Sequence, residues 1–423
     1  MGIAEADTGT PTAGRRFRFL PASATHDATI LVRARAVRAF GDGYVSVLLP
    51  LYLTTLGFGG VQIGAIATAT LLGSAALTLY VGLIAARLAR RTLLLRVAVL
   101  MLLTGLGFTL ARDFWPLLLV AFVGTLNPSS GDVSVFLPTE QALLPQTVAA
   151  RERTALFARY GLTGTLVAAI GALAAGAPSF IAAHTTLGLR TALEGMFLLY
   201  AVLGLIILLL YRGLSPAIEP SEKAPHSPLG PSRRIVYTLA ALFSLDSFAS
   251  GFVIQSLLAL WLFNRFGLSP ALTGTIFFWT GLLSAGSQLL APRLAAKIGL
   301  VNTMVFTHLP ANICLIIVPF MPTLPLALAF LFARSVFSQM DSPARTSYVM
   351  AVVSAPERPA AASVTNVPRS LATAIGPLLA GALFARYSFA WPLVIGGSLK
   401  AFYDLILLGM FRAVRPPEED ERD

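Results

Sequence analysis

Two aspartates lie inside long apolar stretches of this chain, where an ionisable side chain is costly. Asp42 stands between Gly41 and Gly43 in RAFGDGYVSVLLPLYL, and Asp246 lies in ALFSLDSFASGF. A carboxylate in an apolar site can bind and release a proton near neutral pH when no cation is close. Both are therefore candidates for a proton-coupling site. The alternative for each is structural, a hydrogen bond between helices or an internal salt bridge.

A second polar cluster could line a cavity that binds a small molecule. The segment NPSSGDVSVFLPTEQ brings Asn127, Ser130 and Asp132 together next to Pro128. Hydroxyl and amide groups in such a segment can satisfy backbone groups that a proline leaves without a partner. Other candidates for the cavity are the aromatic or amide side chains of Phe40, Tyr44, Phe248, Gln255 and Trp261.

A third group lies in the segment ARSVFSQMDSP, which carries Arg334, Gln339 and Asp341. Arg334 lies near the middle of an apolar run and therefore needs a partner. We expect it to face the acidic groups across a cavity. The alternative is a buried structural ion pair, which would also be costly to break.

The composition indicates that lipid rather than water surrounds most of the chain. Charged residues make up 12% of the 423 residues and apolar types 56%, whereas a soluble globular domain carries about a quarter charged residues. Twelve stretches reach the roughly 20 apolar residues that a bilayer-crossing helix needs. We expect these spans near 36–56, 61–85, 92–111, 115–138, 156–178, 191–211, 236–262, 270–291, 300–320, 323–343, 364–385 and 391–411. The predicted fold class is an all-α membrane protein with twelve transmembrane helices.

The positions of lysine and arginine predict the orientation of these spans. Basic residues gather in the N-terminal region, after the even-numbered spans and near the C-terminus. The other side of the membrane holds only Arg112, Arg190, Arg265 and Arg386. We therefore expect both termini to be cytoplasmic, in a plasma (inner) membrane of bacterial type. The net charge of +11 is then a topology signal and indicates no binding of nucleic acid.

A proline-rich stretch divides the spans into two sets of six. Residues 212–234 contain five prolines together with Ser, Glu and Lys, a composition that forms neither a packed core nor a helix. The predicted organisation has five parts. These are a disordered cytoplasmic tail at 1–29, a six-helix bundle at 30–211, a cytoplasmic linker at 212–234, a second six-helix bundle at 235–412 and an acidic cytoplasmic tail at 413–423.

The two halves are related in sequence, which indicates an internal duplication. Gly64 corresponds to Gly274 with an offset of 210, and AIGALAAG at 169–176 corresponds to AIGPLLAG at 374–381 with an offset of 205. One insertion or deletion reconciles the two offsets. We therefore expect two pseudo-symmetric bundles, with the small residues of these segments allowing helices to pack closely.

A basic turn after the second span supports a family resemblance. It reads GLIAARLARR from Gly82, and a looser version, PRLAAKIGLV with Lys297, follows the eighth span. With twelve spans, two halves and a central linker, the chain resembles the major facilitator superfamily. The resemblance implies transport by alternating access, with spans one, four, seven and ten around a central cavity.

The signature of that family in this turn is similar to G-x-L-A-D-R-x-G-R-R. Gly82, Arg87, Arg90 and Arg91 fit it, whereas Ala86 occupies the position of the acidic residue. The resemblance implies that this acidic residue helps to latch the two halves, and such a latch has no counterpart at Ala86. The basic side chains can still reach the interface and cap helix ends.

Opposite charges occupy matching positions in the two halves. Glu140 and Arg345 each lie two residues after a proline that repeats between the halves. Pseudo-symmetry relates these positions, so we expect a bridge between them to close a cytoplasmic gate. The alternative is a separate partner for each. In span twelve, Lys400 and Asp404 are four residues apart on one helix face, and we expect a local structural pair.

The chain lacks the residue patterns of an enzyme or a metalloprotein. Its single cysteine, Cys314, excludes an intrachain disulfide and a cysteine-cluster metal site, and no two of its four histidines have metal-ligand spacing. It has no glycine-rich phosphate loop with lysine, so we expect neither ATP nor another cofactor. The expected partners are a small solute, protons and lipid, and the expected oligomeric state is a monomer.

These features predict a secondary active transporter for a small solute. Proton-coupled efflux of small organic, drug-like molecules is favoured, because the expected cavity is acidic and apolar with aromatic side chains nearby. Uptake of a nutrient or an anionic solute by a symporter or uniporter, with Arg334 as its clamp, is the alternative. A transporter-like receptor or scaffold is a third possibility, which a flux measurement would separate from the first two.

Overall fold

The computed structural model describes residues 19–84, 89–129, 135–218, 230–353 and 357–411. Within these ranges the chain forms α-helices and short 3-10 helices. The α-helices of the first half are α1 (His26–Thr55), α2 (Gly60–Ile84), α3 (Arg90–Leu110), α4 (Phe114–Val123), α5 (Phe136–Leu143), α6 (Arg153–Leu173), α7 (Ala177–His184) and α8 (Leu189–Arg212). Those of the second half are α9 (Arg233–Gly251), α10 (Gln255–Phe266), α11 (Pro270–Ile298), α12 (Leu300–Ile317), α13 (Leu324–Phe337), α14 (Asp341–Ala351), α15 (Arg358–Arg386) and α16 (Trp391–Phe411). The 3-10 helices are η1 (Leu144–Gln146), η2 (Ala150–Glu152), η3 (Ala174–Gly176), η4 (Pro216–Ile218) and η5 (Val318–Phe320).

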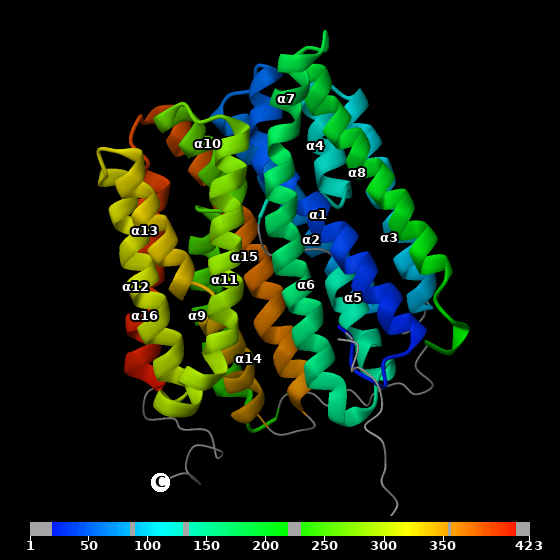
Figure 1. The fold of residues 1–423 in the computed structure, drawn as a ribbon. Coiled ribbons are helices and arrows are strands. Elements are labelled where there is room, and N and C mark those ends of the chain that lie inside the picture. The colour runs from blue at the N-terminus through cyan, green and yellow to red at the C-terminus, as the bar shows by residue number, and fades with distance from the viewer. Residues whose placement is uncertain (1–18, 85–88, 130–134, 219–229, 354–356, 412–423) are drawn as a thin grey trace, which may run out of the picture.

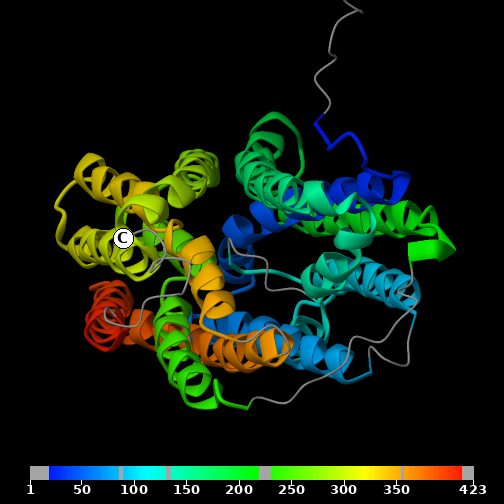
Figure 2. The ribbon, with the colours of Figure 1, turned by 90° about the horizontal axis from the view of Figure 1, so that it is seen from below.

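The sixteen α-helices cross the molecule twelve times. Four crossings are each divided between two helices, namely α4–α5, α6–α7, α9–α10 and α13–α14. One end of the molecule, called the linker end below, is where α1 begins, α8 ends, α9 begins and α16 ends (Figure 1). Viewed from that end, the blue-to-green first half and the green-to-red second half lie side by side (Figure 2). This arrangement confirms the predicted fold class.

Eight of the crossings are long and apolar enough to span a bilayer by length and composition alone. The crossings that fall short are α1, α4–α5, α11 and α13–α14. Several of these helices carry polar groups at membrane depth, and such groups face a protein interior or a water-filled space rather than lipid. α4 and α13 are short rather than polar, but the polar groups of α1, α5, α11 and α14 indicate where an internal site lies.

The duplication is visible in the backbone at two matching turns. Gly57 follows α1 with φ +87°, and Gly267 ends α10 with φ +62°; both lie in the left-handed region. Glycine adopts this conformation without the steric cost that a Cβ brings. The first crossing of each half therefore ends in the same kind of turn, as the 210-residue offset implies.

The two halves touch closely at the end opposite the linker, called the far end below. A Cβ built on Gly64 of α2 would lie 2.4 Å from the carbonyl oxygen of Pro377 in α15, and one on Gly274 of α11 would lie 2.1 Å from that of Ala172 in α6. Gly64 matches Gly274 in the duplication, and Ala172 matches Pro377. The two contacts are thus pseudo-symmetric, and they confirm the predicted close packing by the repeated small residues.

Candidate functional site

A cavity of about 390 Å³ lies between the two halves. It is lined from α1, α5 and α6 on one side and from α10, α11 and α13 on the other. At its deep end the Gln255 side-chain amide donates to the Ser46 hydroxyl across the halves at 2.9 Å. The lining continues to Gln141 and Gln288, which lie nearer the linker end. Beyond the deep end, the glycine contacts close the far end.

The lining is rich in side chains that can exchange hydrogen bonds with a bound solute. On α11, Thr280, Ser284 and Gln288 recur every four residues and so share one helix face. This four-residue spacing of polar side chains in an apolar helix is a signal in the sequence that identifies a cavity-facing helix. Among the described residues, the polar uncharged lining is Ser46, Ser129, Gln141, Tyr160, Thr165, Gln255, Thr280, Ser284, Gln288, Ser335, Ser338 and Gln339.

Four of the residues proposed from sequence line this cavity, namely Asp42, Gln255, Arg334 and Gln339. Three positions lie outside the described residues, namely Arg87, Ser130 and Asp132. The other proposed cavity residues do not line it, and these are Phe40, Tyr44, Asn127, Phe248, Trp261 and Asp341. Tyr44, for example, is fully buried and donates to the carbonyl of Met196 at 3.1 Å.

The expectation of an acidic cavity is therefore wrong for the described lining, and the aromatic side chains that line it are Phe157, Tyr160 and Phe277 rather than the proposed ones. The charged side chains that line it are Arg35, Asp42 and Arg334, so cationic groups outnumber the carboxylate. The proposed aromatic residues lie on faces of their helices that pack against protein. Sequence reasoning missed Arg35, which lies two helical turns before Asp42.

Asp246 lies outside the cavity in a buried network of the second half. The Lys400 ammonium donates to its Oδ1 at 2.7 Å, and Arg345 Nη2 donates to its Oδ2 at 3.1 Å. His308 Nε2 lies 3.8 Å from the same Oδ1. With two cations in direct contact, the carboxylate has its charge balanced by the protein. This arrangement favours the structural alternative for Asp246 over a proton-coupling role.

The predicted local pair between Lys400 and Asp404 is wrong. Lys400 contacts Asp246 on α9, whereas Asp404 Oδ1 lies 2.9 Å from His308 Nδ1 and its Oδ2 accepts from the Asn312 side chain at 2.8 Å. Both residues are buried. Lys400 pairs with a residue of α9 and Asp404 with residues of α12, instead of with each other. Buried charges must be paired or hydrogen-bonded, and packing places these partners within reach.

The structure does not bring Glu140 and Arg345 together. Glu140 is fully buried and accepts from Arg38 Nη2 at 2.8 Å and from the Tyr211 hydroxyl at 2.5 Å. The Tyr160 hydroxyl also donates to it. All three donors belong to the first half, so the predicted bridge across a cytoplasmic gate is wrong in this structure.

Instead, each half contains its own acid–base pair between its first and fourth crossings. Arg38 on α1 pairs with Glu140 on α5, and Asp246 on α9 pairs with Arg345 on α14. Asp341 adds a second carboxylate to Arg345. The two pairs join the same two crossings of each half with the charges exchanged: Glu140 matches Arg345, whereas Asp246 lies two residues before the position that matches Arg38. This exchange explains why the sequence places opposite charges at Glu140 and Arg345.

The basic turn after α2 caps two helices at the linker end. Arg90 Nη1 donates to the carbonyl of Ala142 in α5 at 3.0 Å, and Arg91 Nη2 donates to the carbonyl of Arg212 at the end of α8 at 2.7 Å. Cations at helix C-termini satisfy open carbonyl groups and oppose the helix dipole. The expected capping is confirmed for these two arginines. Lys297, in the related turn, is exposed in the last turn of α11.

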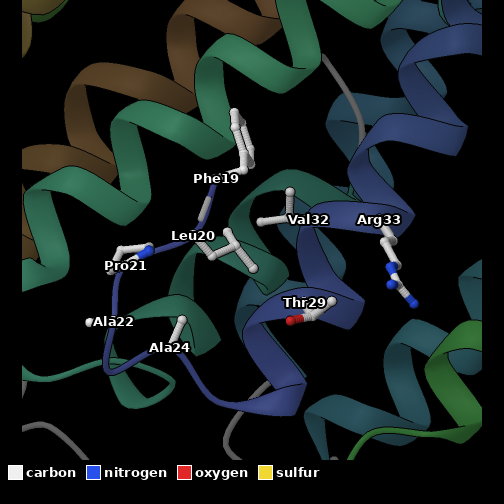
Figure 3. A pocket seen from close by; sticks show the side chains of 8 residues that line it. All are labelled: Phe19, Leu20, Pro21, Ala22, Ala24, Thr29, Val32 and Arg33. Carbon is white, nitrogen blue, oxygen red and sulfur yellow. The ribbon is translucent and has the colours of Figure 1, made fainter. Parts of the chain in front are cut away.

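A second, more open pocket of about 450 Å³ lies beside the start of α1 (Figure 3). Apart from Thr29 and Arg33 its lining is apolar, and all of it belongs to the first half. A site within one half is not opened or closed by relative motion of the halves. The lining is Phe19, Leu20, Pro21, Ala22, Ala24, Thr29, Val32 and Arg33.

Comparison with known proteins identifies the family. The sequence profile described as Major Facilitator Superfamily matches residues 33–334 and 247–423. The chain belongs to the major facilitator superfamily. It is also similar to a curated relative, the uncharacterized membrane protein YJR124C of Saccharomyces cerevisiae, with 26% identity over 428 residues that cover 92% of this chain and 95% of the relative.

Solved major facilitator structures share the fold at low sequence identity. The nucleoside transporter NupG superposes with a TM-score of 0.68 at 14% identity, over 92% of this chain and 100% of that one. An inward-facing bacterial homolog of the human lysosomal transporter Spinster superposes with a TM-score of 0.71 at 14% identity, over 93% of this chain and 98% of that one. The human organic anion transporter MFSD10 superposes with a TM-score of 0.60 at 17% identity, over 90% of this chain and 100% of that one. These likenesses show that the chain shares the fold of these transporters.

Proposed function

We propose that this protein is a secondary active transporter that carries a small polar solute by alternating access. The position of the cavity carries the proposal: it lies between the halves, takes its lining from both, and is closed at the far end through Gly64 and Gly274. Rocking the halves so that these contacts part and the linker end closes would present the same lining to the other side of the membrane.

The fold does not select the solute. The structural neighbours are named for nucleosides in one case and organic anions in another, and those names describe those proteins. Selectivity must therefore come from the lining, whose described residues include twelve uncharged polar side chains and three charged ones. Such a surface favours a solute with several hydrogen-bonding groups over an apolar drug-like molecule.

The test is flux into vesicles that contain the purified protein. A library of polar metabolites is first screened for compounds that raise the thermal stability of the protein, and each compound found is then offered to vesicles with and without a pH gradient. A transporter accumulates at least one of them. A receptor or scaffold would bind the compounds and move none, and that result would contradict the proposal.

The arginine bias supports a cytoplasmic linker end, and the cavity lining that continues toward Gln141 and Gln288 would then face the cytoplasm. Single cysteines are placed at Lys297, near the linker end, and at Thr186, at the far end, in a Cys314→Ser background. An impermeant thiol reagent should label Thr186→Cys in intact cells and Lys297→Cys only after the membrane is permeabilised. The opposite pattern would invert the orientation.

Proton coupling is assigned to Asp42, which unlike Asp246 lines the cavity. Asp42→Asn should abolish accumulation driven by a pH gradient. Exchange of labelled for unlabelled solute should survive, because exchange needs no net movement of protons. Undiminished accumulation by Asp42→Asn at normal expression would remove the aspartate from the coupling step.

A further inference from the structure

We propose that Arg334 binds the solute directly, and that the solute is a small polar organic anion whose carboxylate or phosphate group contacts this guanidinium. This inference rests on the proposed transport function and adds the substrate class and the residue that selects it. It follows from the partners of the arginines inside the helix bundle.

Arg334 differs from the two arginines that pair within the halves. Arg38 Nη2 contacts Glu140 at 2.8 Å and Arg345 Nη2 contacts Asp246 at 3.1 Å. Arg334 donates no hydrogen bond to a described residue and forms no ion pair with one, and its Nε is buried without a partner. Its side chain nevertheless lines the cavity between the halves.

A guanidinium in this position needs an anion. Arg334 lies ten residues into α13, which at about 1.5 Å per residue is roughly 15 Å from the helix start and near the middle of a bilayer core. An arginine stays charged in proteins, and a charge at this depth is costly without a partner. Since no described side chain supplies that partner, a bound solute is the group that would complete the site.

The chemistry of the cavity agrees with an anionic solute. The described charged lining consists of Arg35, Asp42 and Arg334, which sums to one net positive charge with the aspartate ionised. A guanidinium presents a planar fork of donors that matches a carboxylate or a phosphate oxygen pair. Ser338 and Gln339, which follow Arg334 at the end of α13 and also line the cavity, can bond the remaining polar groups of the solute.

The position of Arg334 also connects binding to transport. Arg334 belongs to the second half, while Asp42 and Tyr160 line the same cavity from the first half. A solute held by Arg334 therefore sits against both halves. If the solute binds more tightly when the linker end is closed, its binding shifts the equilibrium toward that state, as alternating access requires.

The first experiment needs no known solute. The arginine is compared with Arg334→Gln in the full-length protein by thermal unfolding in detergent. A residue kept for binding should be neutral or unfavourable for stability, so Arg334→Gln should unfold at the wild-type temperature or above it, whereas Arg38→Gln should unfold at a lower one. A clear loss of stability in Arg334→Gln would show a structural partner and overturn the proposal.

The second experiment uses probe pairs that differ by one anionic group: lactate and propane-1,2-diol, glucose 6-phosphate and glucose, uridine monophosphate and uridine. At least one anion should bind wild-type protein at least tenfold more tightly than its neutral partner. Arg334→Gln should remove that preference, Arg334→Lys should keep part of it, and Lys297→Gln, which removes the same charge at an exposed site, should keep all of it.

The outcomes separate this inference from the proposed function. An anion preference that persists in Arg334→Gln, or no anion preference in any pair, overturns the role of Arg334. Anion binding that depends on Arg334 without flux into vesicles leaves the site standing and contradicts transport. Flux into vesicles that is the same in wild type and Arg334→Gln supports transport and contradicts the role of Arg334.

Discussion

Replacing Asp246 with asparagine is expected to weaken the second half of the molecule rather than its proton coupling. The carboxylate contacts Lys400 at 2.7 Å and Arg345 at 3.1 Å, and all three side chains are buried. The asparagine keeps the shape of the side chain but removes its charge. The consequence depends on which cations retain another carboxylate.

The partners of each cation give the magnitude. Arg345 keeps Asp341, and His308 keeps Asp404, whereas Lys400 has no other ion pair with a described residue. One buried charge is thus left unpaired, and removal of one partner from a buried pair costs about 3–5 kcal/mol. At about 1.4 kcal/mol per factor of ten, a loss of 3 kcal/mol that falls on the unfolding barrier speeds unfolding by roughly 100-fold.

The assay is the half-life of the monodisperse peak in size-exclusion chromatography after heating in detergent, because large membrane proteins unfold irreversibly and a rate is the meaningful quantity. Asp246→Asn should shorten the half-life by about two orders of magnitude. Adding Lys400→Met should recover most of it, since the orphaned charge is then removed. Lys297→Met, at an exposed lysine, serves as the control and should behave as wild type.

Two results would refute this reasoning. If Asp246→Asn has the wild-type half-life, the contacts with Lys400 and Arg345 contribute nothing to stability. If the double variant is no more stable than Asp246→Asn alone, the cost does not come from an unpaired Lys400. Loss of pH-driven accumulation in a fully stable Asp246→Asn would return this residue to the list of coupling sites.

Two further predictions concern motion and pairing. Gly64→Val places its branched side chain where a Cβ already meets a backbone oxygen at 2.4 Å, so it should part the far end and raise thiol labelling of a cavity cysteine at Ser46 from outside; Gly59→Val, with open space around its Cβ, should not. Equal labelling in both variants would contradict the glycine contact as a closure. Glu140→Gln should lower thermal stability, and adding Arg38→Gln should restore part of it, whereas Arg345→Gln should not. Rescue by Arg345→Gln instead would revive the bridge between the halves.

The crossings and the contacts of the repeated small residues could be predicted from sequence because they depend on local composition. A bilayer-crossing helix is recognisable from its own residues, and a glycine that allows backbone contact is recognisable from its repetition. The repeated segments 169–176 and 374–381 are expected to allow close packing, and they contain Ala172 and Pro377. That Gly64 and Gly274 are their partners was learned from the structure.

The partners of the charges could not be predicted in the same way. Glu140 and Arg345 occupy matching positions, yet the rotation of each helix about its axis decides whether a side chain faces the cavity or its own half. Lys400 and Asp404 share a helix face and still separate, because α9 and α12 present better-placed groups. Such rotations result from packing over many helices, which a single sequence does not display.

The described buried ion pairs of this molecule lie within the halves, and the contacts between the halves are of a different kind. The ion pairs found between described residues join groups within one half, as in Arg38–Glu140 and Asp246–Arg345. The described part of the chain shows hydrogen bonds between the halves that join neutral groups, as in Gln255–Ser46 and the bond from the Leu378 N–H to the Thr68 hydroxyl. Relative motion of the halves therefore breaks none of these ion pairs, each of which would cost about 3–5 kcal/mol to disrupt. Closing the linker end then requires mainly the loss of neutral hydrogen bonds and of far-end van der Waals contact, a cost that binding of a solute at Arg334 is placed to offset.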